Sequence, residues 1–163
     1  MVLPGRVRRE NATRHVAIPQ VMALCAIAAA AVAQPSAPPT EAWVPTSRTA
    51  KSITGRVTFA ATGITFQNGK SLPLAANGQM IFRPEKRQKV LADLYRVTQP
   101  EDPTLENGNT ICQGKGVAYL LVWKSPRTGG DVDPRTMAAF SGKSFAVGSH
   151  DECGRFVYDA GAR

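Results

Sequence analysis

The sequence has little of what common catalytic and metal sites are built from. Among its 163 residues are only 2 histidines and 3 cysteines. It lacks a glycine-rich phosphate loop, a G-x-S-x-G nucleophile motif and an H-E-x-x-H zinc motif. It also lacks an apolar run of the roughly 20 residues that a transmembrane helix needs. These absences argue against phosphate-loop nucleotide binders, serine hydrolases, zinc proteases and helical membrane proteins.

What the sequence does contain begins with the pattern of a secretory signal. Four arginines and one glutamate precede an uncharged, apolar stretch, residues 21–33, which ends in the letters AVA. A charged start, a short apolar core and a small-x-small cleavage site define such a signal. We therefore predict that residues 1–33 are a signal peptide, that Gln34 becomes the N-terminus, and that the protein is periplasmic or secreted.

Two alternatives for this segment fit less well. The apolar stretch is too short for a membrane anchor, and a lipidation signal needs a small residue before its cysteine, whereas Leu24 precedes Cys25. Cleavage would leave about 130 residues with a net charge of about +5, which is enough for one soluble domain. A charge of this size does not identify nucleic acid as a partner. We expect no nucleic-acid partner, no cofactor and no membrane span in the mature chain.

Removal of the leader also removes Cys25, so the mature chain keeps Cys112 and Cys153. In an oxidising compartment two remaining cysteines most simply pair with each other. In the chain-entropy model, closing a loop of about 40 residues stabilises a fold by about 4 kcal/mol. The absence of C-x-x-C spacing argues against redox chemistry, and one remaining histidine is too few to complete a zinc site. We predict a structural disulfide between Cys112 and Cys153.

The mature chain divides into two parts by composition. Residues 34–51 begin with four prolines among small residues, a composition typical of an extended chain. We predict a flexible tether there, in which docking of Trp43 on the domain would mark the start of ordered structure. The remainder, residues 52–159, is predicted to be a single β domain.

Short alternating segments separated by turn residues dominate this domain. Alternation of apolar and polar residues predicts half-buried strands, and Asn68-Gly69 and Asn77-Gly78 favour tight hairpin turns. This pattern predicts a mainly β fold, a small antiparallel sandwich or barrel with one disulfide. The predicted strands cover residues 53–59, 64–67, 72–74, 79–82, 90–98, 116–123, 136–147 and 154–158.

Two of these segments are ambiguous. The apolar residues of 90–98 fit a helical stripe as well as a strand face, and the β-rich surroundings favour the strand. Residues 136–147 fit either a strand or one helical turn followed by a strand. By contrast, the continuous apolar run 116–123 predicts a central, buried strand.

Candidate catalytic groups are few and scattered. His150 is the one histidine of the mature chain, and its polar neighbours in sequence point in different directions, so they do not predict a catalytic triad. Two pairs of loop carboxylates are not placed across a cleft by anything in the sequence. We therefore assign no catalytic residue and no metal ligand, and a small hydrolase is kept as an alternative. The carboxylate pairs are Glu101 with Asp102 and Asp131 with Asp133.

The sharpest charge feature is a run of four cations within seven residues, interrupted by Glu85 alone among charged residues. Such a run attracts phosphate or anionic polysaccharide, although its commoner role is a solvated hairpin tip. It lacks the interleaved aromatic residues of single-strand binders. We take it as a candidate anion-binding site, which would allow attachment to an anionic envelope surface. Its members are Arg83, Lys86, Arg87 and Lys89.

Four segments carry a family resemblance: residues 53–59 (ITGRVTF), 64–69 (ITFQNG), 107–112 (NGNTIC) and 153–158 (CGRFVY). They are similar to an uncharacterised group of small exported bacterial proteins. The resemblance implies a compact β domain with a disulfide and no known activity, so it transfers no functional residue. We expect an exported, non-catalytic domain that binds a protein, a glycan or a small ligand, or has a structural role in the cell envelope.

Overall fold

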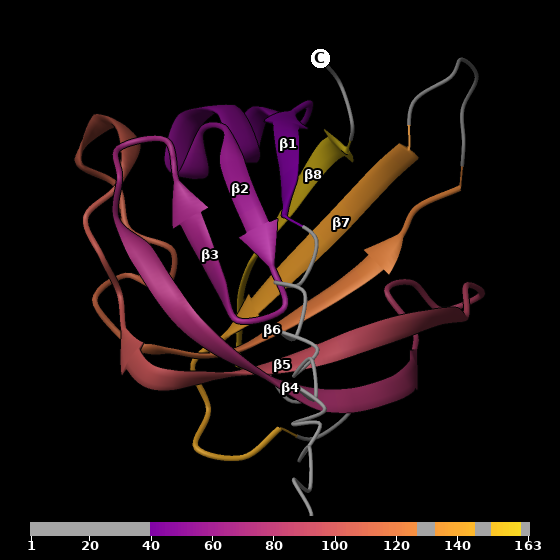
Figure 1. The fold of residues 1–163 in the computed structure, drawn as a ribbon. Coiled ribbons are helices and arrows are strands. Elements are labelled where there is room, and N and C mark those ends of the chain that lie inside the picture. The colour runs from indigo at the N-terminus through magenta and orange to yellow at the C-terminus, as the bar shows by residue number, and fades with distance from the viewer. Residues whose placement is uncertain (1–39, 127–132, 146–150, 161–163) are drawn as a thin grey trace, which may run out of the picture. The chain divides into compact units, whose positions relative to one another are not determined.

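The computed structural model describes residues 40–126, 133–145 and 151–160. These residues form a closed barrel of eight antiparallel strands, in which each strand pairs with its neighbours in sequence and β1 closes against β8 (Figure 1). The mainly β prediction is confirmed, and of the two predicted architectures the barrel is observed. The strands are β1 (Glu41–Pro45), β2 (Val57–Ala60), β3 (Gly63–Phe66), β4 (Ser71–Phe82), β5 (Val90–Glu101), β6 (Val117–Lys124), β7 (Asp133–Phe140) and β8 (Glu152–Ala160).

The ordered domain begins earlier than the sequence predicts. Residues 41–51 were expected in the flexible tether, and they instead form β1 and the start of a π-helical turn, η1 (Ala50–Thr54). β1 pairs with both β2 and β8, and Trp43 is only 1% exposed. Burial of this indole and pairing on two sides outweigh the tether-like composition. Residues 34–39 lie outside the described residues.

Backbone geometry explains two further differences from the predicted strands. The strand expected from Ile53 begins only at Val57, because η1 intervenes and is capped by Gly55, whose φ is 61°. Asn77-Gly78 does not make a turn, since β4 runs through it with a bulge in which Gly78 has a φ of 91°. An extra residue in one strand bends it without ending the pairing.

The other strand predictions agree with the structure more closely. Gly69, with a φ of 82°, lies in the turn between β3 and β4. Residues 90–98 lie in β5, so the strand was the correct choice there, and β6 is the expected buried strand. In the predicted segment 136–147, β7 ends at Phe140, the described part to residue 145 contains no helical turn, and residues 146–147 lie outside the described ranges.

The sheet is apolar on both faces for part of its width. One hydrophobic cluster fills the barrel interior and includes Val57, Ile64, Leu72, Leu120 and Phe156. Because side chains alternate along a strand, Leu121 and Ala138 point outward, where they join a second cluster with Phe82, Trp123 and Phe140. The Arg155 guanidinium lies over the Trp123 ring at 5.7 Å from its centroid and donates to Pro84 O.

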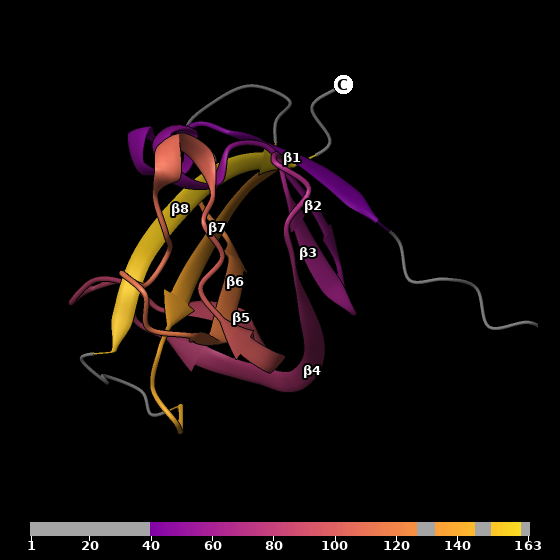
Figure 2. The same ribbon diagram turned by 90° about the vertical axis from the view of Figure 1, so that its left-hand side faces the viewer.

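One end of the barrel is closed by η1 and a loop that contains η2 (Glu106–Gly108). The two lie side by side in Figure 2, and Asn107 and Asn109 donate to Ser52 O at 3.1 and 2.9 Å. The Asp102 carboxylate orders the loop further, because it accepts hydrogen bonds from the backbone N–H groups of Ile111, Cys112 and Gly114. The predicted disulfide is confirmed: Cys112 is bonded to Cys153 and ties this loop to β8.

Within the closed end, Tyr158 and Thr54 form a buried polar pair. Their hydroxyl oxygens are 2.6 Å apart, and the Thr54 hydroxyl also lies 3.1 Å from Ala50 O, to which it donates. Tyr158 therefore donates to Thr54. Burial raises the pKa of Tyr158 well above its ordinary value.

The opposite end of the barrel is open and has an uneven rim. β4 and β5 are each 12 residues long, whereas β2 and β3 have 4 residues each. The last register pair of β3 with β4 is Gly63 with Pro73, so the second half of β4 pairs with β5 alone. The β4–β5 hairpin therefore projects beyond the neighbouring strands at the right of Figure 1.

Candidate functional site

The open end of the barrel contains a cavity of about 650 Å³. Eight-stranded barrels have interiors just wide enough to be filled by side chains or to hold one small ligand. Here the closed half is filled by the interior cluster and the open half is not. The cavity is lined by residues from six strands and the β2–β3 turn: Glu41, Trp43, Phe59, Ala61, Gln79, Val90, Leu91, Asp93, Tyr95, Val122, Trp123, Lys124 and Arg135.

Strand alternation accounts for which residues reach this cavity. On β5, Leu91, Asp93 and Tyr95 share the inner face, and Gln79 on β4 is the register partner of Asp93. On β7, Arg135 lies inward because it alternates with the outer Thr136 and precedes the interior Met137. Val90 and Trp123 also border the cavity, although their side chains pack in or against the outer cluster.

Aromatic rings form the floor of the cavity. Trp43 stacks on Phe59 with ring centroids 4.5 Å apart, and Phe59 meets Tyr95 edge to face at 5.2 Å. Trp43 also lies 5.7 Å from the Tyr158 ring of the closed half. Trp43 is thus the boundary between the filled and the open halves of the barrel.

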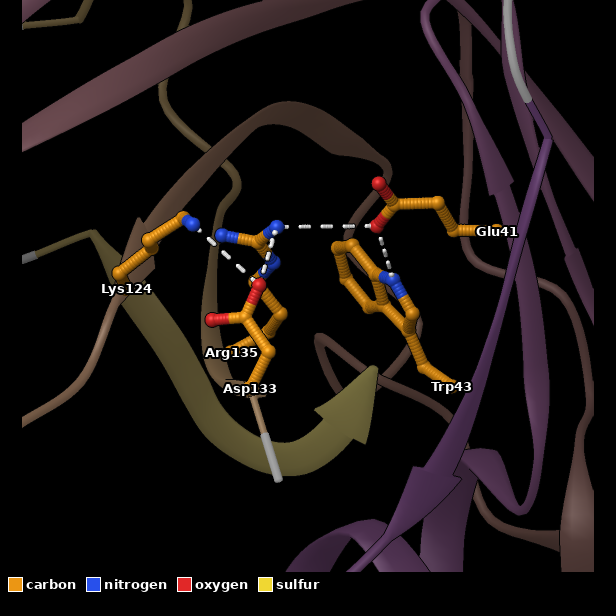
Figure 3. Close-up of polar contacts among 5 residues, drawn as sticks. All are labelled: Glu41, Trp43, Lys124, Asp133 and Arg135. Atoms are coloured by element: carbon orange, nitrogen blue, oxygen red, sulfur yellow. Dashed lines mark hydrogen bonds and ion pairs between the residues drawn. The ribbon is translucent and has the colours of Figure 1, made fainter. Parts of the chain in front are cut away.

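One wall of the cavity is a chain of linked charges (Figure 3). Lys124 Nζ is 3.3 Å from Asp133 Oδ2, and Arg135 Nη2 is 3.0 Å from the same oxygen. Arg135 Nη2 is also 3.8 Å from Glu41 Oε2, which accepts a hydrogen bond from Trp43 Nε1 at 3.0 Å. The Arg135 side chain is only 15% exposed, so its charge needs these two carboxylates.

The facing wall carries a carboxylate with no cation beside it. Asp93 Oδ1 accepts a hydrogen bond of 2.6 Å from Gln79 Nε2, and Asp93 forms no ion pair with any other described residue. Burial raises the pKa of the nearby Tyr95, and the negative charges of Asp93 and Glu41 raise it further, whereas Arg135 lowers it. The phenol therefore stays protonated, and Asp93 is the lining carboxylate that has no cation partner among the described residues.

The residues singled out from the sequence do not form this site. The four cations lie in the β4–β5 connection, where all of them are exposed, as expected for a hairpin tip. Of the four carboxylates, Asp102 orders the closed-end loop, Glu101 is exposed at the end of β5 and Asp133 belongs to the charged wall. Asp131 and His150 lie outside the described residues.

The residues that line the cavity were not identified from the sequence. Neither Asp93 nor Arg135 was among the candidate residues. For Asp93 the available signal is a charged residue on the inner face of a predicted strand, since such a position is normally apolar. Arg135 precedes the predicted strand 136–147 and carried no such signal. That signal becomes readable only when the inner face is known, and barrel closure decides which face that is.

Comparison with known proteins gives no relative for this chain. No family model matches the sequence, and no curated protein or solved structure shows significant similarity to it. Among the described residues, no helix has the length and apolarity to cross a membrane. No group of three or more His, Cys, Asp or Glu side chains within those residues is arranged to hold a metal ion.

Proposed function

We propose that this protein is an exported, non-catalytic binding protein that holds one small ligand in the open end of its barrel. The observation that carries the proposal is the cavity of about 650 Å³ above a floor of stacked aromatic rings. Ligand sites are typically clefts of about 300–1,000 Å³ with apolar walls and a few fixed polar groups. The charged lining residues are engaged with other side chains, Lys124, Arg135 and Glu41 in ion pairs and Asp93 in a hydrogen bond with Gln79, which supports a binding role.

The charges of the cavity indicate the class of ligand. Lys124 and Arg135 are already engaged by Asp133 and Glu41, so an anionic ligand would have to displace one of these carboxylates. Asp93 is free to accept a cation, and Tyr95, two positions along the same inner face, has an aromatic ring that attracts cations as well. The ligand is therefore a small amine or ammonium compound with an apolar, preferably aromatic, body.

The cavity is tested with a neutral fluorescent probe, N-phenyl-1-naphthylamine, whose emission rises in an apolar site. The substitution Ala61→Trp places an indole in the cavity and should weaken probe binding at least about tenfold, because it removes much of the available volume. Ala75→Trp is the matched control, since Ala75 is exposed on β4 and faces outward by alternation with Leu74. Equal affinity in both variants would locate the probe elsewhere and refute the cavity as the binding site.

The ligand class is tested with a pair of naphthalene compounds of opposite charge, naphthylethylamine and naphthylacetate. The amine should bind more tightly than the acid, and Asp93→Asn should weaken amine binding about tenfold through loss of a charge-assisted contact. Asp159→Asn on β8 removes a carboxylate outside the cavity and should change nothing. If the neutral probe binds but the acid and the amine bind with equal affinity, the cavity is still the binding site and the proposed cationic ligand class is wrong.

Export is supported by the N-terminal signal pattern and by the disulfide, a bond that persists in oxidising compartments. Mass spectrometry of the protein purified from its host should find Gln34 as the first residue and a mass lower by two hydrogens than that of the reduced chain. A cytosolic product with an intact leader and free thiols would contradict export.

A further inference from the structure

The projecting β4–β5 hairpin combines two features on one surface. Its connection carries the four cations Arg83, Lys86, Arg87 and Lys89, all exposed, which we call the basic tip. None of them forms an ion pair with another described residue, so their charge is uncompensated within the described part of the chain. Glu85 is the only acidic residue among them.

Directly behind the basic tip lies an exposed apolar pair. Ile81 on β4 and Leu91 on β5 are register partners, and each is 58% exposed. They are the two large hydrophobic residues that stand out as exposed in the described chain. Their exposure follows from the uneven rim, because the register pairs of β3 with β4 end at Pro73 and this part of β4 pairs with β5 alone.

We propose that the β4–β5 hairpin docks on the surface of an anionic phospholipid membrane. The basic tip would lie against the headgroups, where each Lys or Arg is attracted by the negative surface potential. The apolar pair would enter the boundary between headgroups and acyl chains. A small apolar anchor combined with a polybasic patch is the pairing of signals that gives stable, reversible attachment to a membrane.

The chemistry of the apolar pair favours lipid over other polyanions. A single-stranded nucleic acid needs aromatic rings on which its bases stack, and both exposed residues here are aliphatic. A stable protein interface needs about 800 Å² from each partner, far more than two side chains provide. Leu91 also lines the cavity, so docking would turn the open end of the barrel toward the lipid.

The test is flotation of the full chain, as its own host produces it, with two kinds of vesicle. Vesicles of phosphatidylcholine containing phosphatidylglycerol should carry the protein at low salt, and vesicles of phosphatidylcholine alone should not. High salt should release it, since the screening length falls from about 10 Å at 0.1 M to about 3 Å at 1 M. Replacing all four cations of the basic tip by Gln should lower partitioning at least about a hundredfold, because each cation is worth about fivefold.

Matched controls separate docking from net charge and from the cavity. Four exposed cations at the closed end, Arg48, Lys51, Arg56 and Lys70, provide a charge-matched quadruple Gln variant. That variant should keep most of the partitioning. Ile81→Ser should lower partitioning about tenfold by removing apolar contact, and it should leave probe binding intact because Ile81 does not line the cavity.

Three results would overturn the proposal. The first is no flotation with anionic vesicles at low salt. The second is an equal loss in the basic-tip and closed-end variants, which would show attraction by net charge alone. The third is binding to a soluble polyanion such as heparin with no binding to vesicles. Each of these leaves ligand binding in the cavity unaffected, so the two proposals fail separately.

Discussion

The two ends of this barrel differ in how completely their polar and apolar groups are paired with other residues. At the closed end, the polar groups are satisfied by one another: Tyr158 by Thr54, Asp102 by three backbone N–H groups, and Ser52 O by two asparagine side chains. At the open end, Asp93 is held by one neutral amide, and Ile81 and Leu91, on the inner face of the β4–β5 hairpin, are each 58% exposed. Satisfied groups stabilise a fold, whereas unsatisfied ones are available to a ligand or a surface.

Trp43 contacts residues of both ends, and its removal should have the largest effect on the stability of the barrel. Trp43→Ala deletes a ring that stacks on Phe59 and contacts Tyr158, so it should lower the free energy of unfolding by about 3–5 kcal/mol. Urea denaturation followed by circular dichroism measures this loss. Trp43→Phe should retain most of the stability. A loss below about 1 kcal/mol would mean that the cavity floor does not support the packed half.

The disulfide belongs to the closed end alone. The double variant Cys112→Ser with Cys153→Ser should cost about 2–4 kcal/mol of unfolding free energy, since it frees a long loop in the denatured chain. It should leave affinity for the neutral probe unchanged because neither cysteine lines the cavity. Cys25→Ser is the control and should have no effect on the mature protein, in which we expect that residue to be absent. Loss of probe binding in the double variant would show that the two ends are coupled.

The contrast between the ends also explains how far the sequence could be interpreted. Local signals predicted the strands around Asn68-Gly69 and in residues 116–123, because turn chemistry and apolar runs act over a few residues. The disulfide was predicted because removal of the leader would leave the mature chain with only two cysteines. β1 was missed because its stability comes from β2 and β8, and β8 lies more than a hundred positions away. The cavity was missed for the same reason, since its lining comes from strands distributed over most of the domain.

The buried pair at the closed end predicts a specific dependence on pH. The pKa of Tyr158 is raised in the folded state, so the folded protein holds a proton that the unfolded chain releases near its ordinary value of 10.0. Its contribution to stability is therefore complete below pH 10 and is lost as the pH rises beyond it. Tyr158→Phe should cost about 1 kcal/mol at neutral pH, from loss of one buried hydrogen bond.

The same substitution should flatten the decline of stability above about pH 10, because phenylalanine has no proton to lose. Thermal melts of both proteins across that range measure the two slopes. Tyr119→Phe is a suitable control, since its hydroxyl makes only an exposed contact of 3.4 Å with Lys143 O. Parallel slopes in the wild-type protein and Tyr158→Phe would assign the alkaline sensitivity to other groups.

The smallest effect on stability is expected at the apolar pair of the open end, where one substitution at two positions gives a direct comparison. Ile64→Ser places a hydroxyl at a fully buried site and should cost more than about 3 kcal/mol. Ile81→Ser changes a side chain that is 58% exposed and should alter the unfolding free energy by about 0.5 kcal/mol or less. If Ile81→Ser instead lowers the unfolding free energy as much as a core substitution does, the hairpin is covered by protein in solution. Its inner face would then be part of the packed structure and would not be a surface open to lipid.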